Sequence, residues 1–153
     1  TRLKSKIPIV VKISPDIKDE QTELICEILL NHKVSAIIVS NTTVNNRDSL
    51  QDITKHQKGG LSGKPIEDRS NFLIHKFYKN LKNKIKIIGV GGVDSGLSAY
   101  KKFLSGADLI QLYTGMVYKG PNIVNLIKND LSELLLKDGV KNFTEIVGNK
   151  SKS

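Results

Sequence analysis

Short apolar runs alternate with helical patterns along this chain. The runs cover residues 9–13, 36–39, 85–90 and 109–112. Apolar residues spaced three and four apart follow them at 24–29, 74–81, 99–104 and 123–135. Runs of this kind are typical of strands buried on both faces, so the alternation predicts a parallel sheet with right-handed helical crossovers. The fold class is therefore α/β.

Two architectures share this order of elements. A doubly wound domain needs four or five strands, whereas a complete (β/α)₈ TIM barrel usually needs roughly 250 residues. With 153 residues, the chain is long enough for only half a barrel, that is, four βα units in one partial domain over 1–153. In either architecture the loops after the strands form the binding face, where we expect Ser14, Asn41, Gly91 and Thr114.

Composition excludes several classes of protein. The net charge of +9 invites a nucleic-acid interpretation, but the lysines are dispersed and aromatic residues make up only 5%, which argues against it. No apolar run is long enough to cross a bilayer. Cys26 is the only cysteine and excludes an internal disulfide. The three histidines, His32, His56 and His75, have no metal-ligand spacing, and we predict that they lie on the surface.

Four glycines lie in the segment 89–96, at the end of the third apolar run. Glycines let backbone N–H groups approach an anion, and Asp94 or Ser95 can cap a helix that points its positive end at the same ligand. The pair formed by Gly91-Gly92 and Tyr113-Thr114-Gly115 follows two successive strands, where barrels commonly bind phosphate. The alternative is that these glycines serve packing and turns.

Polar residues follow the first two strands. Lys12 lies near the end of the first strand, where it either serves a ligand or reaches solvent or a carboxylate such as Asp16. Asn41 and Thr42 follow the second strand and suit a planar polar ligand, although a simple turn is the alternative. The segment 41–65 is longer than most βα loops, and its glycines at 59–63 favour a lid or binding segment.

Several motifs, taken in order, resemble the dihydroorotate dehydrogenase family. They are Val11 to Asp16, Ser40 to Val44, Gly59 to Pro65, Ile87 to Gly96, Gln111 to Thr114 and Val117 to Pro121. Lys64 and Pro65 after Gly63 look like the quinone-using class 2 enzymes. The resemblance implies an FMN-containing (β/α)₈ barrel that oxidises dihydroorotate to orotate in pyrimidine synthesis and passes electrons to ubiquinone, with this chain as its C-terminal half.

The resemblance also implies roles for particular residues. Lys12 would lie beside the flavin ring, where a positive charge stabilises the reduced, anionic form. The other implied FMN-binding residues are Ser40, Gly63, Gly91, Gly92, Tyr113 and Thr114. Asn41 and Thr42 match positions that hydrogen-bond orotate. The serine base of class 2 enzymes lies upstream of the lysine strand, so Ser14, Ser40 and Ser62 are not expected to act as the base.

By the same resemblance, the quinone-binding and membrane-docking helices and any mitochondrial targeting segment lie upstream of this sequence. The family's location would be the mitochondrial inner membrane, with membrane association only through those segments. We expect negligible turnover from the 153-residue chain alone. The alternatives are another FMN or phosphate-binding barrel oxidoreductase and a non-catalytic half barrel that self-associates through its open edges.

Overall fold

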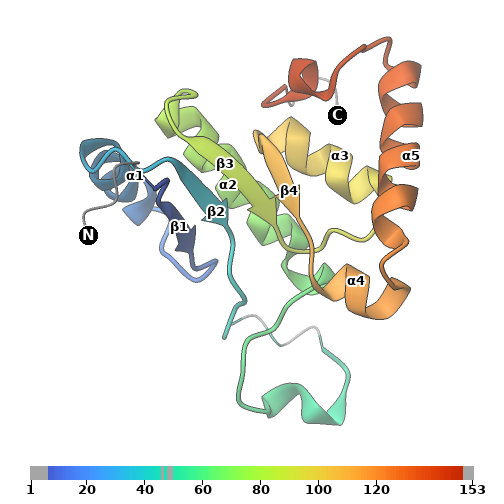
Figure 1. The fold of residues 1–153 in the computed structure, drawn as a ribbon. Coiled ribbons are helices and arrows are strands. Elements are labelled where there is room, and N and C mark those ends of the chain that lie inside the picture. The colour runs from blue at the N-terminus through green and yellow to red at the C-terminus, as the bar shows by residue number, and fades with distance from the viewer. Residues whose placement is uncertain (1–6, 46, 48–49, 150–153) are drawn as a thin grey trace, which may run out of the picture.

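The computed structural model describes residues 7–45, 47 and 50–149. Its sheet contains four parallel strands in the order β1-β2-β3-β4 (Figure 1). They are β1 (Val10–Ile13), β2 (Ala36–Val39), β3 (Lys86–Val90) and β4 (Leu109–Gln111). Each strand pairs with the next one in the sequence. A doubly wound sheet reverses its strand order at a switch point, so this order confirms four consecutive units of a barrel.

Helices cover one face of this sheet, as Figure 1 shows. The four long ones are α1 (Gln21–Asn31), α2 (Glu67–Leu81), α3 (Gly96–Ser105) and α5 (Ile123–Lys137). The predicted helices lie within these bounds. Within the described ranges, no helix is both long and apolar enough to cross a membrane.

Three short helical segments were not predicted. They are α4 (Thr114–Lys119) and the 3₁₀ helices η1 (Ile53–His56) and η3 (Phe143–Ile146). A further 3₁₀ helix, η2 (Lys64–Ile66), leads directly into α2. The most important of these is α4, because the glycine-containing segment after β4 begins a helix instead of forming a loop. A helix this short shows too few turns for apolar spacing to reveal it.

The ends of α3 follow from its sequence. Ser95 is the N-cap residue, and its hydroxyl accepts a hydrogen bond from the backbone N–H of Ser98 in a capping box. Of the two predicted caps, Ser95 is therefore the one used. Gly106 ends the helix in the left-handed conformation with φ +115°, which is the common conformation of a glycine at the end of a helix.

The main core lies between the sheet and α1 and α2. Ile37, Val39 and Ile87 point toward the helices and are buried against residues such as Phe77. The opposite, inner face of the sheet is open, with Leu109 exposed. A strand alternates its side chains between the two faces, so a half barrel buries one set and leaves the other accessible.

The segment between β2 and α2 folds back on itself. Thr43 and Leu61 form an antiparallel bridge with N···O distances of 3.0 and 2.7 Å. The Arg47 guanidinium donates hydrogen bonds to the carbonyls of Lys55 and Gln57. The bridge brings the glycine-rich end of this long loop next to the end of β2, as a lid or binding segment requires. Its residues 46, 48 and 49 lie outside the described part of the chain.

Candidate functional site

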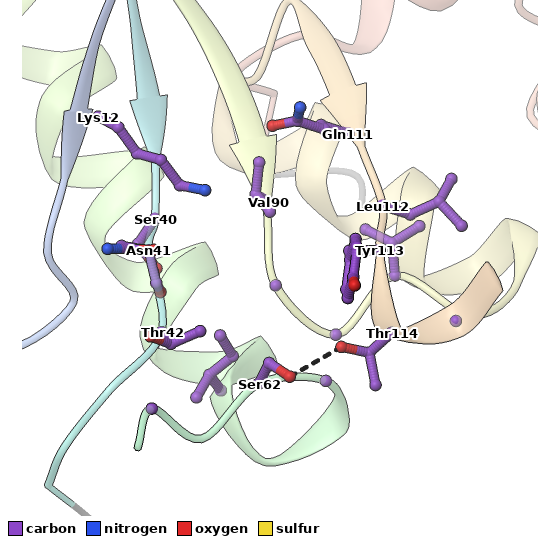
Figure 2. Close-up of a pocket in the computed structure, with 17 residues that line it drawn as sticks. Lys12, Ser40, Asn41, Thr42, Ser62, Val90, Gln111, Leu112, Tyr113 and Thr114 are labelled. Carbon is purple, nitrogen blue, oxygen red and sulfur yellow. Dashed lines mark hydrogen bonds between the residues drawn. The ribbon is translucent and has the colours of Figure 1, made fainter. Parts of the chain in front are cut away.

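A cleft with a volume of ≈ 460 Å³ lies at the carboxyl ends of the four strands. Figure 2 shows the side chains that converge on it from the ends of β1, β2, β3 and β4 and from residues 59–65, which we call the lid segment. All nine residues to which the sequence assigned a cofactor or substrate contact line this cleft: Lys12, Ser40, Asn41, Thr42, Gly63, Gly91, Gly92, Tyr113 and Thr114.

Lys12 lies on the inner face of the sheet, in register with Ile38 of β2. Its side chain is exposed and extends from β1 toward β3 (Figure 2). The carboxylate of Asp16 accepts hydrogen bonds from the Thr43 hydroxyl and from the Val44 N–H, the latter at 2.9 Å. Asp16 therefore connects two loops, and the alternative in which it pairs with Lys12 is wrong.

The three residues after β2 present polar groups in sequence. Ser40 is buried and donates its hydroxyl to the Asn41 carbonyl at 3.2 Å. The Asn41 N–H donates to the Ile13 carbonyl at 2.8 Å, so the backbone continues the pairing with β1 instead of closing a turn. The residues Asn41 and Thr42 are exposed at the cleft wall. Their amide and hydroxyl groups can donate and accept hydrogen bonds.

Gly91 and Gly92 are needed for packing. They adopt φ values of +115° and +76°, which favour glycine. A Cβ on Gly92 would lie 2.4 Å from the Glu67 Cβ, and one on Gly91 would lie 3.0 Å from the Ile66 Cδ1. Close packing against α2 and the residue before it therefore requires glycine at both positions, as the packing alternative proposed.

The N–H groups of these glycines remain available. In the described part of the chain, Gly91, Gly92 and Thr114 donate their backbone N–H to no acceptor in the loops, turns or caps. Buried or half-buried backbone donors normally have a partner. Three unpaired donors at one end of the cleft, all from glycine-rich strand ends, make that end suited to an anion such as phosphate.

The lid segment touches this anion-binding end directly. The hydroxyls of Ser62 and Thr114 are 2.9 Å apart, the contact drawn as a dashed line in Figure 2. Gly63 has φ +80°, and a Cβ there would lie 2.9 Å from the Thr114 Cγ2. Glycine at 63 therefore lets the segment approach α4. Tyr113, by contrast, is 77% exposed at the rim.

Charged groups surround the same end of the cleft. Lys64 pairs with the buried Glu67 at 2.5 Å, and the hydrogen bond that the Lys64 ammonium donates to the Glu67 carboxylate is the main cause that raises the pKa of Lys64. Asp94 lies 3.7 Å from Lys64 and 3.9 Å from Lys119. The ammonium groups of these two lysines contribute a positive potential at the opening.

Comparison with known proteins identifies the family. The family model described as dihydroorotate dehydrogenase matches residues 2–135. The chain belongs to the dihydroorotate dehydrogenase family. It is 40% identical over 141 residues to dihydroorotate dehydrogenase (quinone) of Deinococcus radiodurans, covering 92% of this chain and 38% of that protein. The corresponding enzyme of Idiomarina loihiensis is 44% identical over 125 residues, covering 82% of this chain and 37% of its own.

Solved structures agree with this assignment. Ligand-free DHODH from Eimeria tenella superposes with a TM-score of 0.89 at 35% identity, covering 94% of this chain and 40% of that one. The complex of the Eimeria tenella enzyme with ferulenol gives a TM-score of 0.91 at 33% identity and covers 100% of this chain and 41% of that one. The present chain therefore spans about two fifths of the length of its dihydroorotate dehydrogenase relatives.

The cleft also includes residues that sequence reasoning did not select. They are Ser62, Ile66, Val90, Val93, Gln111 and Leu112. Gln111 was detectable in principle, because alternation along β4 places Leu109 and Gln111 on the same inner face. The hydroxyl of Ser62 was not, because its contact with Thr114 joins residues far apart in the sequence.

The serines in this region have structural partners. Ser14 accepts a hydrogen bond from the Asp16 N–H at 3.2 Å, Ser40 donates to Asn41, and Ser62 pairs with Thr114. None of these contacts places a basic group beside a serine hydroxyl to activate it, as a serine base requires. These contacts agree with the prediction that none of the three serines is the catalytic base, and it stays a prediction.

The described residues contain no group of three or more histidine, cysteine, aspartate or glutamate side chains able to hold a metal ion. His32 and His56 are exposed, as predicted, whereas His75 is half-buried on α2. The prediction of a surface position is thus wrong in part for His75, whose ring Nδ1 is buried.

Proposed function

We propose that this protein takes part in the FMN-dependent oxidation of dihydroorotate to orotate in pyrimidine biosynthesis, with a quinone as the electron acceptor. The chain provides the flavin-phosphate end of the active site and part of the orotate site. The catalytic base comes from a serine outside this sequence. Family membership supports the reaction class, and the cleft supports the division of roles among the residues.

The observation that carries this proposal is the convergence of the residues matched to the family's flavin and orotate contacts on one cleft. They come from four strand ends and the lid segment, which are far apart in the sequence. Strand topology alone brings the four strand ends together, whereas the approach of Gly63 to the same cleft is not required by that topology and adds support. The cleft is also large enough for a planar ligand of cofactor size.

The residues present fit FMN. The unpaired N–H groups of Gly91, Gly92 and Thr114 would bind its phosphate, as such donors bind phosphate at other glycine-rich strand ends. Ser40 and Gly63 would border the flavin, and Tyr113 would cover the opening. Lys12 would place its ammonium beside the ring system and stabilise negative charge that develops there. When bound, FMN supplies the two-electron redox chemistry of the reaction.

The substrate would lie against the end of β2. Orotate and dihydroorotate are planar or nearly planar rings with ring N–H groups, carbonyls and a carboxylate. The side chains of Asn41 and Thr42 provide paired donors and acceptors for such a ring. The backbone bond from the Asn41 N–H to the Ile13 carbonyl at 2.8 Å fixes the position of the Asn41 backbone at the end of β2.

The similar proteins give only limited information about where in the cell this protein acts. The relatives from Deinococcus radiodurans and Idiomarina loihiensis are named quinone enzymes, and both come from bacteria. They do not support the mitochondrial inner membrane, which stays a prediction from the sequence resemblance. Interaction with ubiquinone and with a membrane would come from segments other than this chain.

The proposal is tested on the intact protein that carries this sequence. We expect a yellow protein that reduces a quinone when dihydroorotate is added. Asn41→Ala should lower turnover at least about tenfold through lost substrate hydrogen bonds while the visible flavin spectrum persists. Asn125→Ala, at an exposed asparagine of α5 that does not line the cleft, is the matched control and should leave turnover unchanged. A colourless protein without dihydroorotate-dependent quinone reduction would refute the proposal.

One observation favours a second candidate for the 153-residue chain in isolation. The inner face of its sheet exposes Val10 and Leu109, and among the described residues β1 and β4 are the edge strands, each paired with one neighbouring strand. Such surfaces promote pairing with another chain. We propose that the isolated chain self-associates and has negligible turnover. Size-exclusion chromatography that gives a monodisperse monomer, or robust dihydroorotate oxidation by this chain alone, would contradict that proposal.

A further inference from the structure

A lysine is completely buried behind the glycine-rich end of the cleft. Lys102 of α3 has no solvent-exposed surface. Its ammonium donates to the Ser70 hydroxyl at 3.0 Å and to the Asn71 side-chain carbonyl at 2.9 Å, both on α2. Its aliphatic part passes under β3, where a Cβ on Gly89 would lie 3.2 Å from the Lys102 Cδ. Gly89 thus makes room for this lysine.

Burial of this ammonium is unfavourable on its own. Removal from water lowers the pKa of Lys102 to about 7, while the negative charges of Glu67 and Asp68 oppose that shift and the positive charge of Lys64 adds to it. An apolar side chain of similar length would fill the same space without a desolvation penalty. The hydrogen bonds that the ammonium makes are therefore the feature that distinguishes lysine from methionine at this position.

Ser70 links the ammonium to the cleft. Its hydroxyl accepts from Lys102 and donates to the Val90 carbonyl at 2.6 Å. The same carbonyl accepts the Ser40 N–H at 3.1 Å. Val90 is the last residue of β3 and precedes Gly91, so two hydrogen bonds separate the ammonium from the peptide that sets the direction of the Gly91 N–H.

Lys102 cannot touch a ligand in the cleft. It belongs to α3, which with α2 lies on the helix-covered side of β3 (Figure 1), whereas the cleft opens on the inner side and does not include Lys102 in its lining. Any effect of this lysine on a ligand is therefore transmitted through Ser70 and the end of β3, or through its charge.

We infer that Lys102 is a positioning residue for the anion-binding end of the cleft. Through Ser70 it holds the Val90 carbonyl and thereby aims the N–H groups of Gly91 and Gly92 at a phosphate. This inference rests on the proposed function and deepens it, because it assigns the preference for a phosphorylated over a non-phosphorylated flavin to a residue outside the cleft.

The test compares FMN with riboflavin, which has the same ring system and no phosphate. Both dissociation constants are measured by fluorescence titration of the deflavinated intact protein. Lys102→Met should weaken FMN binding about tenfold, the loss expected for one charge-assisted hydrogen-bond arrangement, and change riboflavin binding less than about twofold. Lys101→Met is the matched control, because Lys101 is the exposed neighbour on the same helix, and it should bind both flavins like the wild type.

A second variant keeps the test decisive if Lys102→Met does not fold. Ser70→Ala retains Lys102 and its hydrogen bond to Asn71 but removes the hydroxyl that connects the Lys102 ammonium to the Val90 carbonyl. It should also weaken FMN binding selectively. A merely structural role predicts equal losses for both flavins, and this result, or an unchanged ratio of the two constants in Ser70→Ala, overturns the inference. If the wild-type protein itself does not prefer FMN to riboflavin, the proposed cofactor site fails instead.

Discussion

The two faces of the sheet carry polar residues in opposite environments at its carboxyl edge. On the inner face, Lys12 and Asn41 are exposed to the cleft. On the helix-covered face, Ser70 and Lys102 are fully buried and hydrogen-bond each other at 3.0 Å. Groups on the first face can contact a ligand, whereas groups on the second determine where the backbone donors of that ligand site point.

Substitutions on the two sides of the sheet should therefore affect different properties of the protein. Substitutions on the inner face should change binding or turnover while stability stays nearly constant, because exposed side chains contribute little to folding. Substitutions on the buried face should change stability and, through the backbone, binding as well. The following predictions test that separation, from the largest expected effect to the smallest.

Gly92→Ala should give the largest loss of stability. The new Cβ would lie 2.8 Å from the Glu67 Cα, a backbone atom, at φ +76°, so neither steric overlap nor backbone conformation can relax cheaply. We expect a loss of about 3 kcal/mol or more in the free energy of unfolding. Gly120→Ala, at φ +73° with nothing within 4 Å, should cost only about 1 kcal/mol. Urea unfolding of the intact protein measures both, and equal losses would contradict the packing account.

The buried Lys102 should make stability depend on pH. Its pKa is about 7 in the folded state and near 10.5 when exposed. Between these values the unfolded state binds more protons, so stability should rise with pH. We expect a gain of about 1.5 kcal/mol from pH 7 to 8.5, a range below the ordinary pKa of Cys26, whose own pKa burial raises to about 11.

This gain should be absent in Lys102→Met and present in Lys101→Met, as measured by urea unfolding at each pH. The comparison between variants isolates Lys102, because the other titratable groups are common to all three proteins. A wild-type profile that matches Lys102→Met over this range would mean that the lysine is not buried as described.

Lys12→Met should act on the reaction and leave the fold intact. Loss of the positive charge beside the proposed flavin ring should slow flavin reduction by dihydroorotate at least about tenfold, with a change in unfolding free energy within about 0.5 kcal/mol. Lys18→Met, another exposed lysine, serves as the control. Stopped-flow absorbance and urea unfolding give the two readouts, and an unaltered reduction rate would remove Lys12 from the site.

Ser62→Ala should have the smallest effect. It removes the hydroxyl contact of 2.9 Å with Thr114, which joins the lid segment to the anion-binding end. A net hydrogen bond contributes about 1 kcal/mol, so we expect FMN to bind about fivefold more weakly. Ser35→Ala, at an exposed serine remote from the cleft, should leave the affinity unchanged. Equal affinities of Ser62→Ala and the wild type would show that the lid does not support the cofactor.

The inner face could be predicted from the sequence largely because its residues occur in short motifs next to strand ends. Apolar runs locate the four strands within a residue or two, and the residues that follow each run must converge in a parallel sheet. The family motifs then name Lys12, Asn41 and Gly91 directly. Local sequence and topology together contain this information.

The buried face could not be predicted in the same way. A helical lysine such as Lys102 indicates a solvent-exposed position, because lysines are almost never fully buried. The glycine cluster was also treated as one cradle, although Gly89 accommodates Lys102 and a Cβ on Gly96 would lie 2.2 Å from the Asp130 Cβ. These roles depend on which helices pack together, and no local pattern records that packing.

The most direct test of this account is a crystal structure of the intact protein with bound FMN. The account predicts that phosphate oxygens lie within hydrogen-bond distance of the N–H groups of Gly91, Gly92 and Thr114, with the ring system beside Lys12. A flavin phosphate bound elsewhere, with these three donors still unpaired, would contradict it.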